Sequence, residues 1–289
     1  IKEKGSFVEG LMQGSNTSFH ENGRLHIETE LKDSKIDGEY KYYLPSGALK
    51  QKKFFKDGNL SGKYTAYFNV GESIPEFEAE YLNDTIIGVY KEYYATGQLY
   101  EESFYDEGQL QKKKKYFFNG EPLEEVNYKN NNLDGPYVQY HLNGNLSQEG
   151  QFSEGEYTGA WKYYYPDGVL KNEFEYINGK IDGISKFYDQ DGILHYELEY
   201  RKGIIIAYKY YDKEGNIIIE DRKKGGEFFY KAYNPNGTVL AEGLYDIKGG
   251  KKGEWLYYSN FGVLEGKGNY TDGELDGEYT LYFEDGSIK

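Results

Sequence analysis

A 24-residue repeat is the feature that most constrains this chain. In the stretch Gly159–Gly183, GAWKYYYPDGVLKNEFEYINGKIDG, we number Gly159 as offset 0, and Gly183 restarts the count at offset 24. The same spacing returns in about eleven successive units from Gly14 to Gly277, and partial units occupy residues 1–13 and 277–289. A fixed period of this length indicates an array of one supersecondary unit. We therefore predict a single repeat array over residues 1–289, with full repeats over residues 14–276.

Each unit has the pattern of one β-hairpin. Offsets 2–6 are rich in aromatic residues, a turn that ends in glycine follows, and a second strand runs from about offset 11 to 17. Glycine after Asp or Asn supplies the positive φ that tight hairpin turns need. In the reference unit the recurring structural positions are Gly159, Trp161, Gly168, Leu170, Glu173 and Tyr176. The pattern predicts an all-β fold, an elongated and twisted antiparallel meander or solenoid of about eleven to twelve hairpin repeats.

A charge pattern fixes the predicted register. If opposed residues have offsets that sum to 17, offset 3 faces offset 14, and opposite charges on such a pair stabilise a sheet. Lysine at offset 3 and glutamate at offset 14 recur together in Lys91/Glu102, Lys162/Glu173, Lys186/Glu197, Lys209/Glu220 and Lys231/Glu242. This register places Trp161, Leu170 and Tyr176 on one face, which we expect to be the more buried.

Offset 5 does not fit that division of faces, because it is aromatic in every unit although it shares a face with the charged offsets. Either a bulge turns this residue inward or both faces carry an aromatic row. The residues at this offset are Phe19, Tyr43, Tyr67, Tyr93, Phe117, Tyr140, Tyr164, Tyr188, Tyr211, Tyr233, Tyr258 and Tyr282.

Three regions depart from the period, and we expect the array to kink or loosen there. Gly62–Gly88 has two extra residues around Ile74 and Pro75, and Lys112–Gly135 is one residue short. Ile206–Gly253 contains a unit that is two residues short and then one that is a residue long, with Phe228 in the place of the opening glycine.

Composition excludes several classes of function. A net charge of −15 disfavours nucleic acid and anionic membranes as partners, because both repel a negatively charged protein. The chain has no cysteine, which excludes disulfides and thiolate metal sites, and no apolar run long enough to predict a transmembrane segment. The first residue, Ile1, is explained equally by removal of an N-terminal segment and by a cloning boundary. The compartment stays open, with cell surface, periplasm or secretion favoured over the cytoplasm.

The sequence predicts no catalytic residue, no metal ligand and no cofactor. The four histidines fall in different units or on opposite faces, and no nucleophile elbow or phosphate-binding loop occurs. The segments Asp189–Gly192 and Asp212–Asn216 resemble calcium loops, but acidic hairpin turns explain them better because the distal glutamate of such loops is missing.

Two groups of residues are candidates for binding. The run Lys112, Lys113, Lys114 and Lys115 could contact phosphate or an acidic partner, or else form a solvated strand edge. The tyrosine row, represented by Tyr164, Tyr188 and Tyr211, could stack sugars or anchor a partner, or else pack a thin sheet. The glutamates at offset 14 could form an acidic stripe for a basic partner, or else answer the facing lysines: Glu28, Glu78, Glu102, Glu149, Glu173, Glu197, Glu220 and Glu242.

The signature G-x-[WY]-x-x-[YF]-[YF]-x-x-G-x-L-x-x-E-x-x-Y-x-x-G-x-[IL]-x-G resembles the bacterial variant of the MORN repeat, best carried by Gly38–Gly62, Gly88–Lys112, Gly159–Gly183 and Gly253–Gly277. The resemblance implies a protein-interaction or lipid-contacting module, of a type found in antitoxins of toxin–antitoxin pairs and in surface or secreted proteins. We therefore expect a non-catalytic interaction scaffold whose partner is another protein. The alternatives are an antitoxin-like protein and a surface adhesin that binds glycans or a host.

Overall fold

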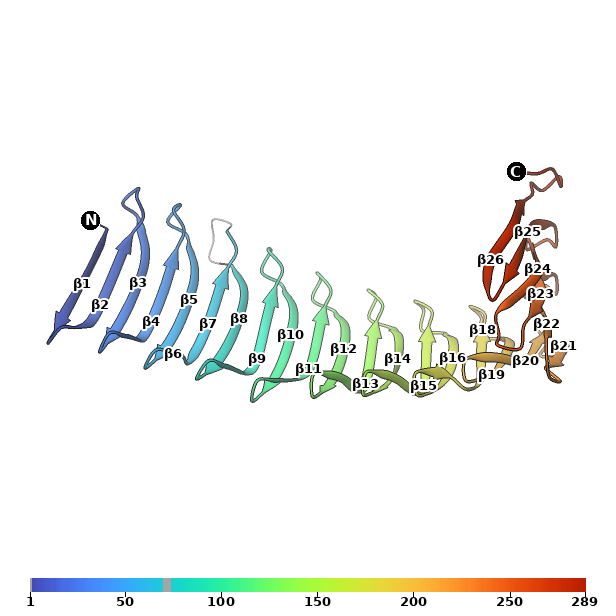
Figure 1. The fold of residues 1–289 in the computed structure, drawn as a ribbon, viewed down its shortest axis with the longest axis horizontal. Coiled ribbons are helices and arrows are strands. Elements are labelled where there is room, and N and C mark those ends of the chain that lie inside the picture. The colour runs from blue at the N-terminus through green and yellow to red at the C-terminus, as the bar shows by residue number, and fades with distance from the viewer. Residues whose placement is uncertain (1, 70–73) are drawn as a thin grey trace. The chain divides into compact units, whose positions relative to one another are not determined.

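The computed structural model describes residues 2–69 and 74–289, which form 26 β-strands. The chain divides into two compact units, one made of residues 1–145 and 152–155 and the other of residues 146–151 and 156–289. Within each sheet the strands follow one another in chain order (Figure 1), and neighbouring strands pair antiparallel. The part of the chain that the structure describes is thus a β-meander, as the repeat predicts. The two extra residues of Gly62–Gly88 fall partly at positions 70–73, outside the described residues.

The first unit holds thirteen complete strands. They are β1 (Glu3–Val8), β2 (Leu11–Phe19), β3 (Leu25–Lys32), β4 (Lys35–Tyr43), β5 (Leu49–Lys56), β6 (Asn59–Leu60), β7 (Gly62–Tyr67), β8 (Pro75–Leu82), β9 (Thr85–Tyr93), β10 (Leu99–Asp106), β11 (Gln109–Tyr116), β12 (Pro122–Lys129) and β13 (Asn132–Tyr140). Strand β14 (Leu146–Ser153) contributes residues to both units. Sheet pairing continues without a break from β10 through β11 and β12 to β13, so the short repeat at Lys112 does not interrupt the sheet.

The second unit holds two sheets. The strands of the first are β15 (Glu156–Tyr164), β16 (Leu170–Ile177), β17 (Lys180–Ile181), β18 (Gly183–Tyr188), β19 (Leu194–Arg201), β20 (Ile204–Tyr211) and β21 (Ile217–Arg222). A separate five-stranded sheet follows, made of β22 (Phe228–Tyr233), β23 (Val239–Tyr245), β24 (Lys251–Tyr258), β25 (Leu264–Thr271) and β26 (Glu274–Leu281).

The predicted hairpin register is confirmed, with one bulge. Gly159 pairs with Tyr176 and Lys162 with Glu173, so opposed offsets sum to 17 over most of the hairpin. Tyr163 pairs with Asn172 but Tyr164 pairs with Leu170, which leaves Lys171 as an extra residue in the second strand. The bulge therefore lies opposite offset 5 and does not turn the offset-5 side chain inward. It also breaks the alternation that would place Leu170 with Trp161, because Leu170 is opposed to Tyr164 on the other face.

Both faces carry an aromatic row, which decides the question that the sequence left open. On the face of Trp161, rings at offsets 2, 4, 13, 15 and 17 pack on one another within and between hairpins, for example Phe174 on Tyr163 and Phe187, each with centroids 5.5 Å apart. Trp161 is only 1% exposed. We call this the aromatic face. The offset-5 tyrosines lie on the opposite face with the charged residues, which we call the ladder face.

One offset-5 assignment is wrong. Tyr116, and not Phe117, pairs across its hairpin with Pro122, just as Tyr93 pairs with Leu99. The hydroxyl of Tyr116 also makes the hydrogen bond that is typical of offset 5, to Glu102 at 2.8 Å. The short repeat therefore opens one residue earlier than its sequence suggests, at Gln111.

The opening glycines do more than punctuate turns, because most of them lie within strands at positive φ. Gly38 in β4 has φ 130° and Gly159 in β15 has φ 63°. A Cβ on Gly38 would lie 2.8 Å from a carboxylate oxygen of Glu30 on the neighbouring strand. Glycine is needed there both for the backbone conformation and for the close approach of the next hairpin.

The expected irregularity at Ile206–Gly253 is a complete break between sheets. Strand β21 pairs with β20, whereas β22 pairs with β23 in the five-stranded sheet. Eleven residues separate Glu220 from Lys231, while thirteen separate the equivalent Glu173 from Lys186. The return connection is therefore two residues too short to bring β22 beside β21 in the regular register.

Aromatic packing joins the two sheets of the second unit instead. Their buried cluster contains Leu198, Tyr208, Tyr210, Phe228, Tyr230, Ala232 and Trp255. The hydroxyls of Tyr210 and Tyr230, one from each sheet, are 3.0 Å apart and hydrogen-bonded. This cluster is a buried core of the second unit, and its packing connects the two sheets where backbone pairing is missing.

Candidate functional site

A chain of hydrogen bonds runs along the ladder face. The tyrosine at offset 5 of one repeat donates its hydroxyl proton to the glutamate at offset 14 of the repeat before it, so each bond joins two hairpins. The bonds are Tyr43–Glu28 at 2.8 Å, Tyr93–Glu78 at 3.1 Å, Tyr116–Glu102 at 2.8 Å, Tyr164–Glu149 at 2.6 Å, Tyr188–Glu173 at 3.3 Å, Tyr211–Glu197 at 2.8 Å and Tyr258–Glu242 at 2.8 Å. We call this series the tyrosine–glutamate ladder.

Lysines extend the ladder, because Glu102, Glu173 and Glu197 each face a lysine of their own hairpin and one of the next. Glu28 and Glu78 face a threonine in their own hairpin and a lysine in the next. Glu173 pairs with Lys162 across its own hairpin and with Lys186 of the following one, and their charged groups lie 3.9 and 3.8 Å away. Lys186 lies opposite Glu197 across its own hairpin, as predicted. The ion pair of Lys186, however, is with Glu173 of the preceding hairpin. The offset-14 glutamates thus serve chiefly to join neighbouring hairpins.

The ladder changes the ionisation of its tyrosines. Burial, followed by the hydrogen bond and charge of the facing glutamate, raises the pKa of five of them to about 12: Tyr43, Tyr93, Tyr116, Tyr188 and Tyr258. The same causes raise the pKa of Tyr164 and Tyr211. A neutral hydroxyl donates to the carboxylate, whereas a phenolate would repel it.

Glu220 is the exception in the ladder. Among the described residues its ion-pair partner is Lys209, at 3.2 Å, and no tyrosine hydroxyl donates to it. Its side chain is 59% exposed, whereas the ladder glutamates in comparable ion pairs, Glu78, Glu102, Glu173 and Glu242, are 18–28% exposed. Tyr233, which the repeat predicts as its donor, packs instead against Tyr210 with ring centroids 5.4 Å apart.

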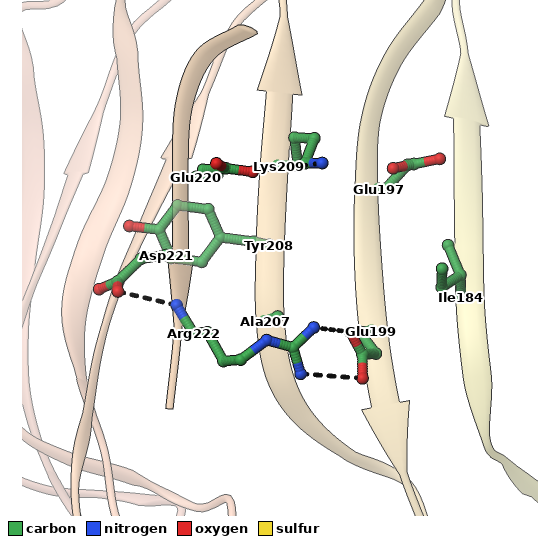
Figure 2. A pocket seen from close by; sticks show the side chains of 9 residues that line it. All are labelled: Ile184, Glu197, Glu199, Ala207, Tyr208, Lys209, Glu220, Asp221 and Arg222. Carbon is green, nitrogen blue, oxygen red and sulfur yellow. Dashed lines mark hydrogen bonds and ion pairs between the residues drawn. The ribbon is translucent and has the colours of Figure 1, made fainter. Parts of the chain in front are cut away.

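A charged hollow of about 420 Å³ lies over strands β18 to β21, where the ladder is interrupted at Glu220 (Figure 2). Four carboxylates line it, those of Glu197, Glu199, Glu220 and Asp221, together with Lys209, Arg222, Ile184, Ala207 and Tyr208. Arg222 grips Glu199 with both terminal nitrogens, one of them at 3.0 Å, and this pairing lowers the pKa of Glu199. Four acidic groups against two cations leave the hollow with a net negative charge.

A second hollow, of about 570 Å³, has an aromatic lining. Rings of Tyr165, Phe187, Tyr196 and His195 meet acidic and amide groups there, and Pro235 from the turn after β22 contributes to the wall. Phe187 stacks on Tyr196 with centroids 4.2 Å apart. Both hollows are of a size that ligand sites commonly have.

The lysine run is divided between the two faces and fully engaged in ion pairs. Lys112 and Lys114 bind Glu125 on the ladder face, the latter at 3.2 Å. Lys113 reaches Glu101 at 2.9 Å on the aromatic face, where Glu101 is 7% exposed. Lys115 pairs there with Glu124 at 2.9 Å. The structure therefore sets these cations among carboxylates of the adjacent strands.

The segments that resemble calcium loops use their carboxylates within the turn. Asp189 accepts backbone N–H bonds from Asp191 and Ile193, each at 2.9 Å. Asp212 accepts from the side-chain amide of Asn216 at 2.9 Å and from the backbone N–H groups of Asn216 and Glu214, and these bonds lower the pKa of Asp212. Among the described residues, no three His, Cys, Asp or Glu side chains come together as a metal site requires.

The histidines are less scattered than their sequence positions suggest. His20 and His26 flank the same hairpin tip, and their ring centroids are 4.4 Å apart. His20 contacts the carbonyl oxygen of Tyr43 through Nε2 at 2.8 Å. His195 makes a similar contact with the carbonyl of Tyr233 at 3.0 Å, and burial lowers its pKa. These contacts position hairpin tips and the five-stranded sheet.

A comparison with family models finds a similarity in six parts of the array. The model described as "MORN repeat variant" matches six segments, residues 36–57, 87–107, 112–130, 133–154, 157–178 and 181–202. These six segments are similar to MORN-variant repeats. Each covers one hairpin and the start of the turn that follows it, and together they make up less than half of the chain.

No curated protein sequence matches the chain. The solved structures that it matches include the crystal structure of TcdB2-TccC3, at 12% identity over 98% of this chain and 18% of that chain, with a TM-score of 0.18. Another is the Photorhabdus luminescens Tc holotoxin pore with a TccC3 mutation, at 13% identity over 96% and 20% of the two chains, with a TM-score of 0.16. The chain spans about a fifth of the length of these proteins, and superpositions this loose carry no argument.

The described residues also include no helix with the length and hydropathy that a membrane crossing needs.

Proposed function

We propose that this chain is a non-catalytic scaffold that binds another protein through an extended, acidic and tyrosine-rich β surface. MORN-variant repeats are in general binding repeats, and six segments here are similar to them. The observation that carries the proposal is the division of labour between side chains. Ladder residues such as Glu173 and Tyr188 are engaged in joining hairpins, while the positions between them vary from repeat to repeat. Those variable positions supply the specificity.

The charge of the surface selects the kind of partner. A net charge of −15 and the acidic hollow at β18–β21 favour a partner with a basic surface, because complementary charge accelerates association and excludes like-charged competitors. Binding would be spread over several repeats, with exposed apolar side chains such as Ile184 and Phe229 as anchors within a charged surround.

The proposal is tested by removing whole repeats. A chain that lacks residues 135–182 keeps its phase, because Gly183 takes the place of Gly135. We expect this deletion to weaken binding to a purified partner, captured with the full chain from cells of the source organism, by about a hundredfold or more. Circular dichroism should show unchanged strand content per residue. A folded deletion variant that binds as tightly as the full chain would contradict the proposal.

An antitoxin-like role is one form of this function, in which the bound protein is a toxin. It predicts that the gene beside this one encodes a protein that stops growth when expressed alone and is neutralised when the two are co-expressed. Growth that continues with the neighbouring gene alone would exclude this form.

A glycan-binding adhesin is the second candidate, and the aromatic hollow favours it. Tyr165, Phe187 and Tyr196 offer flat rings, and Asp189 and Gln190 offer hydrogen-bonding groups beside them. This is the combination that stacks and orients sugars. A glycan array probed with the intact chain, with a Tyr196→Ala variant as control, would show binding that the variant loses; an array without binding would remove this candidate.

A further inference from the structure

The break between the sheets leaves an open strand edge in the interior of the sequence. Strand β21 is paired on one side with β20, over residues from Ile217 to Arg222. On its other side no strand pairs with it among the described residues, because β22 pairs with β23. An edge of this kind exposes unpaired N–H and C=O groups that can accept another strand.

The first half of the edge lacks the usual protection against such pairing, whereas the second half carries the exposed charges of Glu220, Asp221 and Arg222. Its sequence, IIIEDR, contains no proline and no lysine, and its first residues are apolar and exposed: Ile217 by 51% and Ile218 by 39%. Proteins normally blunt an edge with prolines, inward charges or a covering loop. An exposed apolar start of high β propensity, followed by charges that can select a partner, is suited to strand addition.

The ladder shows which side chains such a strand would carry. At the regular position of Glu173, the next strand β18 supplies Lys186, with its Nζ 3.8 Å away, and Tyr188, with its hydroxyl 3.3 Å away. Glu220 occupies the same position on β21 but has neither group from a following strand. It stands 59% exposed at the rim of the acidic hollow that contains Glu197 and Asp221.

We propose that β21 accepts, by antiparallel strand addition, an extended segment of the partner protein in which a lysine or arginine precedes a tyrosine by two residues. The basic residue would pair with Glu220 and enter the acidic hollow, and the tyrosine hydroxyl would donate to the same carboxylate. The inference rests on the proposed function in that the occupant is another protein. The strand completes the rung of the ladder that β22 leaves empty.

A peptide with the sequence of residues 180–189 tests the inference, because it contains β18 and therefore the complement of a ladder glutamate. We expect it to bind the full chain, as measured by fluorescence anisotropy of a labelled peptide. A glutamate in place of the peptide's lysine should weaken binding about tenfold, as should Glu220→Lys in the protein, since each places like charges together. The two changes combined should restore the affinity.

Two further variants separate charge recognition from misfolding. Glu220→Gln keeps the shape of the side chain and should weaken binding less than Glu220→Lys. Glu175→Lys makes the same change in net charge at an exposed position of the interior strand β16 and should leave peptide affinity unchanged. Equal losses for Glu220→Lys and Glu175→Lys, or no binding of the unmodified peptide, would overturn the inference.

Sedimentation of the chain without a partner tests whether a second copy of the chain occupies the edge. A dimer that Glu220→Lys dissociates would show that a second copy fills the edge, and it would overturn the assignment to a different protein. The failure of this inference is distinguishable from that of the proposed function. If the peptide does not bind but deletion of residues 135–182 still weakens binding of the partner, only the strand-addition inference is refuted. If the peptide binds but the deletion leaves partner binding unchanged, only the proposal of a binding surface spread over several repeats is refuted.

Discussion

At the scale of single residues, the two tryptophans show how tightly neighbouring hairpins fit. Trp161 lies over Gly150 and Trp255 over Gly243, and a Cβ on these glycines would lie 2.1 and 2.4 Å from the rings. Each indole N–H donates to the carbonyl of the residue after the glycine, Gln151 or Leu244, at 3.0 Å. The same large-for-small arrangement thus occurs twice, and it buries both rings almost completely.

The first prediction concerns this fit. Gly150→Ala should lower the free energy of unfolding by about 1–3 kcal/mol, because the added methyl overlaps a ring that close packing holds in place. Chemical denaturation of the purified variant measures the change. Gly266→Ala is the matched control, since its Cβ would meet the flexible end of Leu281 at 3.3 Å.

Rescue distinguishes the ring contact from a backbone effect. Trp161→Leu in the Gly150→Ala background should recover part of the lost stability, because the smaller side chain leaves room for the methyl group. If the double variant is as unstable as the sum of both single changes, the steric explanation is wrong.

At the scale of the hairpin, much of the structure could be predicted from the sequence. The glycine turns and the Lys/Glu pairs gave the register, because both act between positions close in the chain and leave a periodic trace. The bulge at Lys171 leaves no such trace, since it is set by the need of the second strand to follow a turn of fixed geometry. For the same reason the sequence could not place Leu170 on its actual face.

The ladder itself could have been found in the sequence but was not. A tyrosine at offset 5 follows the preceding offset-14 glutamate by 15 residues in pairs such as Glu28 and Tyr43. Reading each repeat as a closed unit hides a contact that crosses the repeat boundary. The aromatic hollow could not be predicted from the sequence, because Pro235 in its wall comes from the five-stranded sheet and its place depends on how that sheet packs.

The second prediction concerns the length of the connection between β21 and β22. Insertion of Asn-Gly after Arg222 restores the regular spacing between Glu220 and Lys231, so we expect β22 to pair with β21. Because the chain has no cysteine of its own, a disulfide between Glu220→Cys and Lys231→Cys can form only between these two introduced residues and therefore reports pairing of β22 with β21. Oxidation should join the two cysteines in the lengthened chain.

The chain of natural length with the same two cysteines is the control, and it should stay unjoined. The insertion should also remove binding of the 180–189 peptide, since its edge would be occupied. A lengthened chain that does not form the disulfide would show that the aromatic cluster around Tyr230, and not the connection, determines the break.

At the scale of the whole molecule, tyrosine replaces the aliphatic core of an ordinary domain. The chain has 34 tyrosines and a mean hydropathy of −0.85, so burial must come from rings whose hydroxyls remain bonded or wet. Exposed ion pairs of the kind seen on the ladder face contribute roughly 0–1 kcal/mol each. Stability is therefore the sum of many similar contacts between adjacent hairpins.

The third prediction is that the fold resists alkali up to about pH 10 and then fails. The pKa of five ladder tyrosines, Tyr43, Tyr93, Tyr116, Tyr188 and Tyr258, is raised from 10.0 to about 12 in the folded chain. Their contribution is fully present below the pKa of the unfolded chain and is lost as pH rises through the folded pKa. Tyrosinate absorbance and circular dichroism should change together between pH 10 and 12.

Replacement of one ladder tyrosine checks the cause. Tyr43→Phe cannot ionise and should shift the alkaline transition while it removes one late-titrating group, whereas Tyr279→Phe, on an exposed side chain, should leave the transition in place. Strand structure that persists after the ladder tyrosines have ionised would contradict the prediction.

Two contacts, between Glu149 and Tyr164 and between Gly150 and Trp161, indicate which end points of a repeat duplication preserve the fold. Each pair lies on both sides of a repeat boundary, so a duplication cut from glycine to glycine would separate partners that must match. A duplication cut within the hairpin tips, for instance at residues 166–168, carries both members of each pair together. The unit of duplication in this array therefore runs from one hairpin tip to the next, half a period out of phase with the glycine-to-glycine hairpin.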